Sequence, residues 1–378
     1  MDGYAIALAS LMLGAGTVGD IGGHKRVVLW GLAVFGIASL GCGLATSTMV
    51  LVGFRILQGI GAALLLPVTL AVIAHAFPEP GDRARAIGLW AGIGSVALPA
   101  GPLLGGALVQ GIGWRAVFFI NVPIVAVAVA ARVVSESTES QQRSLDVPGV
   151  LLGAALLAFV TFAFVEAGHA GVSIAVVIAI VVAIGVLVTL VIVEARTADP
   201  MLPLALFRRP DFSTANAVAG TMNLAALGLI FVLTLYLQGV QRRSALDAGV
   251  AVLPLFAPLG VLAPLAGRLT ARIGAKWPMA IGLLSAAVGV ALLVLAQPDS
   301  NYVTLLPAML LWGIGLGILT PAVVAAAIGA VPADRAGLAS AVNNTARQAG
   351  GAIGIAAFGA LAGQPEARAS SPASIPRP

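Results

Sequence analysis

Charge is scarce in this sequence of 378 residues, since 9% are Asp, Glu, Lys or Arg and 60% are hydrophobic. The mean hydropathy is +1.05. Soluble domains carry about 25% charged residues, so this composition excludes an ordinary soluble globular protein. The charges stand in clusters separated by apolar stretches of about 20 residues, the length that spans a bilayer. We therefore predict an all-α, polytopic membrane protein with twelve apolar segments.

Cysteine and histidine are also nearly absent. Cys42 is the single cysteine and lies within an apolar run, so neither a disulfide framework nor a thiolate metal site can be built. His24, His75 and His169 lie in loops or at predicted helix ends, without clustered metal ligands. We expect no cofactor, no metal site and no enzymatic activity.

The formal net charge of +5 is distributed over the loops. If the loop around Asp20 is cytoplasmic and the segments alternate, the inner loops hold thirteen Lys and Arg residues and the outer loops five. This asymmetry obeys the positive-inside rule. The charge is therefore a signal of topology, and nucleic acid is not an expected partner. Because arginine outnumbers lysine eighteen to two, a pattern associated with GC-rich bacteria, we expect a multi-pass protein of a bacterial plasma membrane, acting as a monomer.

Residues 88–106 form an apolar segment that is rich in glycine and contains no charge. Gly88 and Gly92 are four residues apart, as are Gly101 and Gly105, so each pair shares one helix face. Small residues in this spacing let a neighbouring backbone come close. Both a kinked, tightly packed span and a moving part of the protein fit this composition.

The spacing of glycine and proline in this segment resembles the fifth-helix antiporter motif of the major facilitator superfamily, in its drug:proton antiporter branches. The resemblance implies a helix that helps to keep the transport path from leaking, and so favours exchange over uniport. The residues that carry it are Gly94, Gly101, Pro102, Gly105 and Gly106.

Residues 16–26 form a glycine-rich turn with one acid and two fixed bases. The turn resembles the signature loop that this superfamily has between its second and third helices. The resemblance implies that the acid and the bases hold a cytoplasmic gate shut by pairing with neighbouring helices. Ile21 departs from the family pattern, in which a basic residue is usual, and this departure removes one gate contact. The gate residues of this turn are Gly16, Asp20, Gly23, Lys25 and Arg26.

Arg55 lies about six residues into an apolar segment, which places it about 9 Å below the membrane surface. A charge at membrane depth costs at least about 2.5 kcal/mol. Arg55 therefore either snorkels to the surface or faces a polar interior. The pattern Arg-x-x-Gln-Gly-x-Gly resembles the fourth helix of the superfamily, whose arginine is tied to proton coupling. The resemblance implies a coupling role for Arg55 and Gln58.

An acid that could carry the coupled proton cannot be identified in the sequence. None of the fifteen acids lies deep in an apolar segment, and Asp2 is near the end of one. Because Asp2 lies near the end of an apolar segment, we include it among the candidate coupling residues. Glu166 and Glu194 lie at the ends of two otherwise featureless segments and are most simply solvated caps.

The second half of the chain repeats features of the first half. Asp82-Arg83-Ala84 returns 252 positions later, and Pro67 and Pro78 return 254 positions later. Gly16, Gly23 and Lys25 return 251 positions later as Gly267, Gly274 and Lys276, with Arg272 between them. Three pieces at nearly one offset predict two parallel repeats. The resemblance extends the cytoplasmic gate to Gly267, Arg272, Gly274 and Lys276.

We divide the chain into four parts on this basis. They are an N-terminal helical bundle (1–133), a linker with two inserted helices (134–211), a C-terminal helical bundle (212–363) and a disordered tail (364–378). Polar residues within the C-terminal bundle are candidates for a substrate path: Asn216, Asn223, Gln238, Asn343 and Arg347. They serve equally well as hydrogen-bonding links between helices, so both alternatives stay open.

Residues 114–123 resemble the sixth helix of the fourteen-span drug exporters. The fourteen-span family has both chain ends in the cytoplasm. In this chain, segments that alternate across the membrane would put both ends outside, so we expect the chain to lack that family's first and last helices. The missing first helix would bring an Asp-x-Thr motif that the family associates with coupling. The sequence allows two interpretations. The protein is a proton-coupled exporter of hydrophobic or amphipathic small molecules, or it is a truncated, transport-inactive member of the same family.

Overall fold

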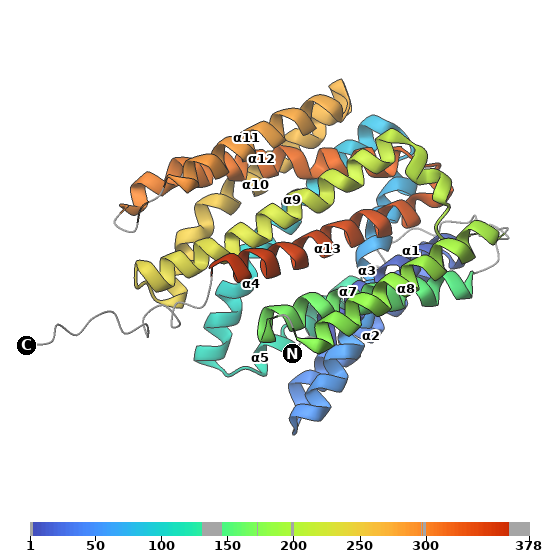
Figure 1. Ribbon diagram of the computed structural model, residues 1–378, viewed down its shortest axis with the longest axis horizontal. Coiled ribbons are helices and arrows are strands. Elements are labelled where there is room, and N and C mark those ends of the chain that lie inside the picture. The colour runs from blue at the N-terminus through green and yellow to red at the C-terminus, as the bar shows by residue number, and fades with distance from the viewer. Residues whose placement is uncertain are drawn as a thin grey trace, which may run out of the picture.

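The computed structural model describes residues 3–130, 146–171, 173–197, 200–295, 297 and 300–362, and these residues contain helices and no strands. The helices, drawn in Figure 1, are α1 (Gly3–Gly22), α2 (His24–Leu44), α3 (Thr48–Ala76), α4 (Pro80–Gly111), α5 (Ala116–Phe119), α6 (Asn121–Ala130), α7 (Val147–Ala170), α8 (Ile174–Arg196), η1 (Leu204–Arg208), α9 (Pro210–Leu235), η2 (Tyr236–Val240), α10 (Ala245–Ile273), α11 (Lys276–Val294), α12 (Tyr302–Gly329), η3 (Ala333–Arg335) and α13 (Ala336–Ala362). The predicted all-α fold is confirmed.

Eight of the described helices are long and apolar enough to cross a membrane. They are α2, α3, α7, α8, α9 with η2, α10, α11 and α12. The predicted segment after Trp114 is split at Ile120 into α5 and α6. Aliphatic side chains of α8 such as Ile178 and Val181 are 57% and 63% exposed, which in a membrane places them against lipid.

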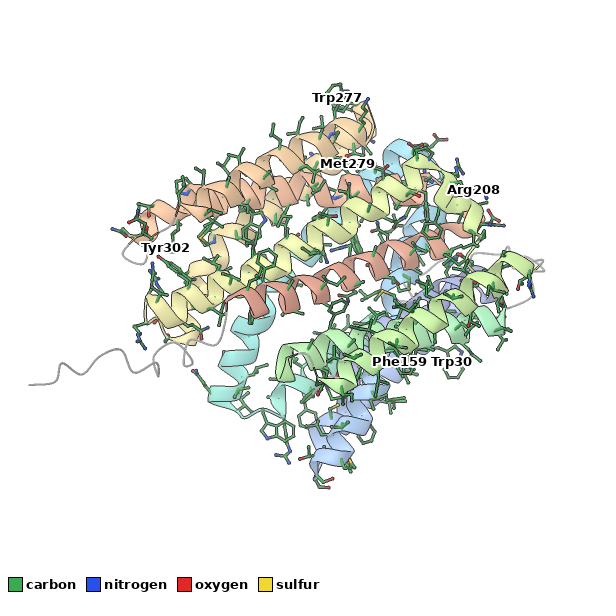
Figure 2. The ribbon with its side chains drawn as sticks, viewed as in Figure 1. Trp30, Phe159, Arg208, Trp277, Met279 and Tyr302 are labelled. Carbon is green, nitrogen blue, oxygen red and sulfur yellow. The ribbon has the colours of Figure 1, made fainter. Side chains whose placement is uncertain are left out.

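Aromatic side chains mark both ends of the C-terminal helices. Trp277 lies at the start of α11 and is 60% exposed, and Tyr302 lies at the opposite end, at the start of α12 (Figure 2). The Tyr302 hydroxyl donates a hydrogen bond to the carbonyl oxygen of Ala251 at 2.9 Å. Amphipathic rings at the two ends of spanning helices are typical of membrane interfaces.

The predicted repeat is present in the fold. Helices α1 to α4 recur in order as α10 to α13, and the turns after α1 and α10 share an uncommon backbone geometry. Gly23 and Gly274 occupy equivalent places in those turns, with φ of +89° and +78°. Glycine adopts such values without a steric penalty. Pro67 and Pro321 are likewise both buried, inside α3 and α12.

The two repeats meet along two pairs of helices. The helix α4 packs along α10, and α1 packs along α13. The inserted hairpin of α7 and α8 lies beside α1 and α13 (Figure 1) and contacts them through α7. The largest buried cluster surrounds Trp312 and is formed by α9, α10 and α12. The predicted domain boundary at 133–134 and the predicted tail at 364–378 lie outside the described residues, and the boundary at 211–212 remains a prediction.

Candidate functional site

A close crossing of α1 and α13 joins the first repeat to the second. A Cβ atom on Gly16 would meet the carbonyl oxygen of Gly337, and it would lie 2.6 Å from the Cβ of Ala341. One turn further along α1, the carboxylate of Asp20 accepts hydrogen bonds from the backbone N–H groups of Gly337 and Leu338, both at 2.9 Å. A helix N-terminus favours negative charge. Asp20 therefore ties α1 to the first turn of α13.

His24 completes this contact on the side of α2. Its Nε2 lies 3.2 Å from Oδ1 of Asp20, and its ring centroid is 4.8 Å from that of His75 on α3. His24 is 3% exposed. The turn at Gly23 sets this geometry, because it lets α2 begin directly after α1 and brings an imidazole back to the carboxylate.

The corresponding contact between α4 and α10 has an alanine at the position of Asp20. A Cβ atom on Gly88 would lie 2.7 Å from the Cα of Gly267, so these two helices also cross backbone to backbone. The position equivalent to Asp20 is Ala271, which faces Gly81 near the start of α4. Among the described residues, α1 is therefore linked to α13 by a charged group, whereas the contacts recorded between α10 and α4 are close packing.

The four basic residues of the predicted gate make no recorded ion pair within the described ranges. Lys25 is half-buried, whereas Arg26, Arg272 and Lys276 are exposed. Lys276 Nζ lies 5.9 Å from the ring centroid of Trp277. The role of these bases in closing a gate stays a prediction.

Arg55 is held by a hydrogen-bonded network that crosses three helices. Its Nη1 donates to Oε1 of Gln58 at 2.6 Å, and Nε2 of Gln58 donates to Oγ of Ser39 at 2.7 Å. Asn121 Nδ2 reaches the same hydroxyl at 3.4 Å. Gln58 is 2% exposed and Ser39 is fully buried. These partners favour a polar interior for Arg55 over snorkelling to the surface.

Aromatic rings enclose the same guanidinium group. Its carbon lies 4.2 Å from the ring centroid of Tyr4 and 5.8 Å from that of Phe118. Cation–π attraction strengthens where water is excluded. The predicted coupling residue Asp2 lies outside the described residues. Arg55 and Gln58 thus form a defined site, and their role in coupling stays a prediction.

The glycines of α4 fall into two sets. Gly88 and Gly92 lie against α10, with Cβ positions 2.7 Å and 2.9 Å from atoms of Gly267 and Pro264, as their spacing predicted. The expectation that Gly101 and Gly105 admit a neighbouring backbone is wrong for the described residues, since a Cβ atom there would meet nothing within 4 Å. The same holds for Gly94 and Gly106.

The physical reason is that the recorded close contacts of α4 with α10 lie on its first half. Val96 is the last α4 residue recorded close to a glycine of α10, where its Cγ2 lies 3.2 Å from a Cβ built on Gly260. The side chain of Pro102 lies outside the described set. The antiporter motif therefore lies on an open part of α4, and its role in sealing a path stays a prediction.

The polar residues of the predicted substrate path are in different environments. Nδ2 of Asn343 donates to Oδ1 of Asn216 at 3.2 Å, which links α13 to α9, and both residues are buried. Asn223 is half-buried, and Gln238 is exposed within η2 at the end of α9. The half-buried Arg347 has an Nε atom without a partner among the described residues.

Glu194 is not a solvated cap, and that expectation is wrong. It is 3% exposed, and its Oε2 accepts a hydrogen bond from the N–H of Leu202 at 3.0 Å. The reason is that residues 200–208 fold back over the end of α8 and cover the carboxyl group. The one sequence signal for this fold is the pair Pro200 and Pro203 around two apolar residues. For Glu166, which is half-buried, the cap interpretation stays a prediction.

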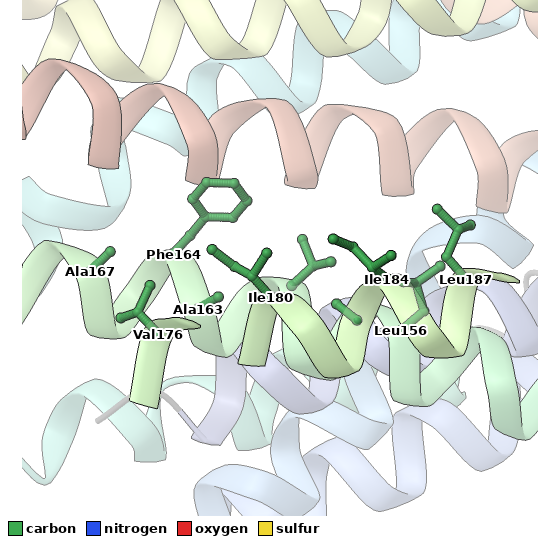
Figure 3. Close-up of a pocket in the computed structure, with 10 residues that line it drawn as sticks. Leu156, Ala163, Phe164, Ala167, Val176, Ile180, Ile184 and Leu187 are labelled. Carbon is green, nitrogen blue, oxygen red and sulfur yellow. The ribbon is translucent and has the colours of Figure 1, made fainter. Parts of the chain in front are cut away.

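A cavity of about 300 Å³ lies between α7 and α8 (Figure 3). Its ten lining residues are all apolar and include Ala163, Phe164 and Ile184. Ligand pockets usually add a few polar groups that fix orientation, so this cavity offers apolar contact alone. Within the described ranges there is also no group of three or more side chains able to hold a metal ion.

The sequence matches the family model of the Major Facilitator Superfamily over residues 1–355. The chain belongs to the major facilitator superfamily. The family predicted from the turn at 16–26 and from the fourth- and fifth-helix motifs is therefore confirmed. As a member with eight apolar spans among its described residues, the chain is a multi-pass membrane protein of a transporter family rather than of an enzyme family.

Named relatives of this superfamily member are resistance proteins of bacteria. It is 34% identical over 361 residues to the multidrug resistance protein Stp of Mycobacterium tuberculosis, covering 95% of this chain and 67% of that protein. It is 36% identical over 369 residues to the methylenomycin A resistance protein of Streptomyces coelicolor, covering 96% and 76%. The similarity thus extends over nearly the whole of this chain.

Solved structures show the same fold. The human organic anion transporter MFSD10 matches with a TM-score of 0.66 at 15% identity, covering 95% of this chain and 77% of the other. The proton:xylose symporter XylE matches with a TM-score of 0.59 at 14% identity, covering 96% and 84%. At these identities the match supports the fold alone.

Proposed function

We propose that this protein is a secondary active efflux transporter that exports hydrophobic or amphipathic small molecules, such as drugs or antibiotics, by proton antiport with alternating access. Its family and the names of relatives that are 34% and 36% identical over most of the chain support export of toxic compounds. Its partners would be the lipid bilayer, the exported molecule and protons. Export against a gradient needs an energy source. In this proposal the site around Asp20 is the gate, and the site around Arg55 couples export to proton entry.

The observation that carries this proposal is the contact between Asp20 and the first turn of α13. It lies on the side assigned to the cytoplasm by the loop charges, and it joins the two repeats. Its hydrogen bonds run between a carboxylate and backbone N–H groups, a charge-assisted type about twice as strong as a neutral bond. A transporter that opens inward must break this contact and form it again.

The network around Arg55 supports the coupling half of the proposal. A guanidinium group held by Gln58 and Tyr4 keeps a fixed positive charge among the helices of the first repeat. Intramembrane charges are functional candidates by default. An acid that gains or loses a proton would change its attraction to this charge, and we assign this role to Asp2 from its position in the sequence alone.

The test is efflux of a lipophilic dye from cells expressing the chain as written, with and without a protonophore. We expect the protonophore to abolish efflux. We also expect Asp20→Asn to reduce the efflux rate about tenfold. Asp82→Asn is the matched control, because Asp82 pairs with Arg85 on the surface, where both side chains are more than half exposed. Correctly inserted protein that moves none of a panel of dyes would contradict the proposal and favour a transport-inactive protein.

A further inference from the structure

Two buried carboxyl groups meet at the inner end of the inserted hairpin. Glu194 lies in the last turn of α8 and is 3% exposed. Its Oε2 accepts the N–H of Leu202, whereas its Oε1 is buried without a hydrogen-bond partner in the described part of the chain. An unsatisfied buried oxygen is costly, and for a charged carboxylate more so.

Asp146 lies beside Glu194, and both of its carboxylate oxygens accept hydrogen bonds. It is the N-cap of α7 and 7% exposed, and its Oδ1 accepts the N–H of Gly149 at 2.9 Å. Its Oδ2 accepts the N–H of Met201 at 3.1 Å. Both oxygens of Asp146 are therefore hydrogen-bonded to backbone donors.

Gly149 shows how close the two acids lie. A Cβ atom built there would meet Oδ2 of Asp146, and it would lie 2.7 Å from Oε1 of Glu194. The unpartnered oxygen of Glu194 and an oxygen of Asp146 therefore converge on the Cβ position of Gly149. Glycine is required here because any side chain would enter the space between the two carboxyl groups.

Among the described residues, neither carboxyl group has a recorded ion pair with a basic side chain. In the described parts of α7, α8 and residues 200–208, Asp146 is the titratable group whose charge acts on Glu194. Among the described basic residues, Arg196 and Arg208 are the nearest along the chain to Glu194, and both are exposed. Arg143, three residues before Asp146, lies outside the described residues. Two carboxylates that share a buried site cannot both stay ionised at little cost, so one of them takes a proton.

We propose that Asp146 and Glu194 form a proton-binding carboxyl pair, in which a proton on Oε1 of Glu194 is shared with Oδ2 of Asp146. The proton comes from cytoplasmic water and returns to it when residues 200–208 lift from the end of α8. The bound proton gives the unpartnered oxygen its missing hydrogen bond. It also removes the repulsion between the start of α7 and the end of α8.

The pair lies next to the contact between the two repeats. Met201, whose N–H is bound by Asp146, packs in one buried cluster with Leu13 of α1 and Leu338 of α13. The N–H of Leu338 is one of the two donors held by Asp20. Loss of the proton would therefore loosen residues 200–208 beside the inner contact. This inference concerns proton binding and stands whether or not the chain exports a substrate.

Infrared spectroscopy of the purified full chain in lipid tests the proposal, because the carbonyl stretch of a protonated carboxyl group is resolved from that of a carboxylate. We expect a protonated-carboxyl band in the wild type at about pH 7, well above the usual titration of Glu near 4.3. Glu194→Gln should remove this band. Glu166→Gln, which changes an acid near the other end of the same hairpin, should keep it.

A second variant keeps the test decisive if Glu194→Gln does not fold. Asp146→Asn should shift the band, because the shared proton then has a neutral partner. A wild-type spectrum without the band would overturn the proposal, as would a band that survives in Glu194→Gln. Thermal stability that depends on sodium or potassium ions, with no band present, would assign the site to a metal cation instead and equally overturn it.

Discussion

The Cα atoms of Gly88 and Gly267 face each other where α4 crosses α10, so closely that a Cβ atom on Gly88 would lie 2.7 Å from the Cα of Gly267. The carbonyl oxygen of Ala263 would lie 2.8 Å from the same Cβ atom. Both neighbours are backbone atoms, which cannot rotate away. The contact between the two repeats on this side therefore depends on the absence of side chains.

Gly88→Ala should destabilise the protein by about 1–3 kcal/mol, because the added methyl group overpacks this crossing and pushes α4 from α10. Gly101→Ala is the matched control in the same helix, since its Cβ atom would meet nothing within 4 Å. Alanine in a helix interior is favoured over glycine by about 1 kcal/mol, so the control should be neutral or stabilising. Thermal unfolding of both purified variants measures the difference, and equal melting temperatures would contradict the crossing.

Asp20→Asn should release the first turn of α13 from α1. The amide keeps one acceptor for the N–H groups of Gly337 and Leu338 but loses the charge that the helix N-terminus favours, at a cost of about 0.3–2 kcal/mol. Release can be read with a cysteine at Ala341, which is buried at the crossing with Gly16. In a Cys42→Ala background, Ala341→Cys should react with a cytoplasmic thiol reagent faster when Asp20→Asn is present.

The control for this labelling is Asp82→Asn, which removes an exposed acid at the start of α4 and should leave the reaction rate unchanged. A rate that is the same in all three backgrounds would show that Asp20 does not hold the contact shut.

Arg55→Ala should abolish export while leaving the protein in the membrane. Arg55→Lys should also lose most of the activity, because a lysine does not match the fork of an arginine that donates to Gln58 while stacking on Tyr4. Arg196→Ala removes an exposed arginine and is the control. Dye efflux and the amount of inserted protein are measured together, and normal export by Arg55→Ala would exclude the coupling role.

Asn216 and Asn223 lie on the same helix, and we expect the first to stabilise packing and the second to contact substrate. Asn216→Ala breaks the hydrogen bond from Asn343, and links of this kind in membranes contribute about 0.6 kcal/mol on average and up to about 1.7. Asn223 makes no recorded side-chain hydrogen bond among the described residues. We expect Asn216→Ala to lower the melting temperature and Asn223→Ala to change the affinity for substrates instead. Unchanged affinity in Asn223→Ala across a dye panel would remove Asn223 from the substrate path.

Local and periodic features of this fold could be predicted from the sequence. The glycines at 16, 23, 267 and 274 mark the repeat because a turn with positive φ and a backbone crossing each require glycine, whatever surrounds them. The spacing of Gly88 and Gly92 likewise predicted one packed face of α4.

Partners far apart in the chain could not be predicted in this way. Ser39 and Asn121 are 82 residues apart and meet only because α2 and α6 pack together. The sequence predicts a solvated cap at Glu194, because the distance of Glu194 from the helix end is all that the sequence shows. The burial comes from residues 200–208, whose return path depends on tertiary packing against α1 and α13.

Arg347 should set the charge preference of the exported molecule. Arg347 is half-buried in α13, and its buried Nε has no hydrogen-bond partner among the described residues. We therefore expect the guanidinium to attract an anionic group and to disfavour cations nearby. Arg347→Gln should raise the ratio of cationic to anionic dye efflux on the order of tenfold, the equivalent of about 1.4 kcal/mol. Arg347→Lys keeps the charge and should keep the ratio near that of the wild type. An equal loss of both dyes in Arg347→Gln, with the same loss in Arg347→Lys, would show instead that the side chain stabilises the packing of α13 and does not select substrates.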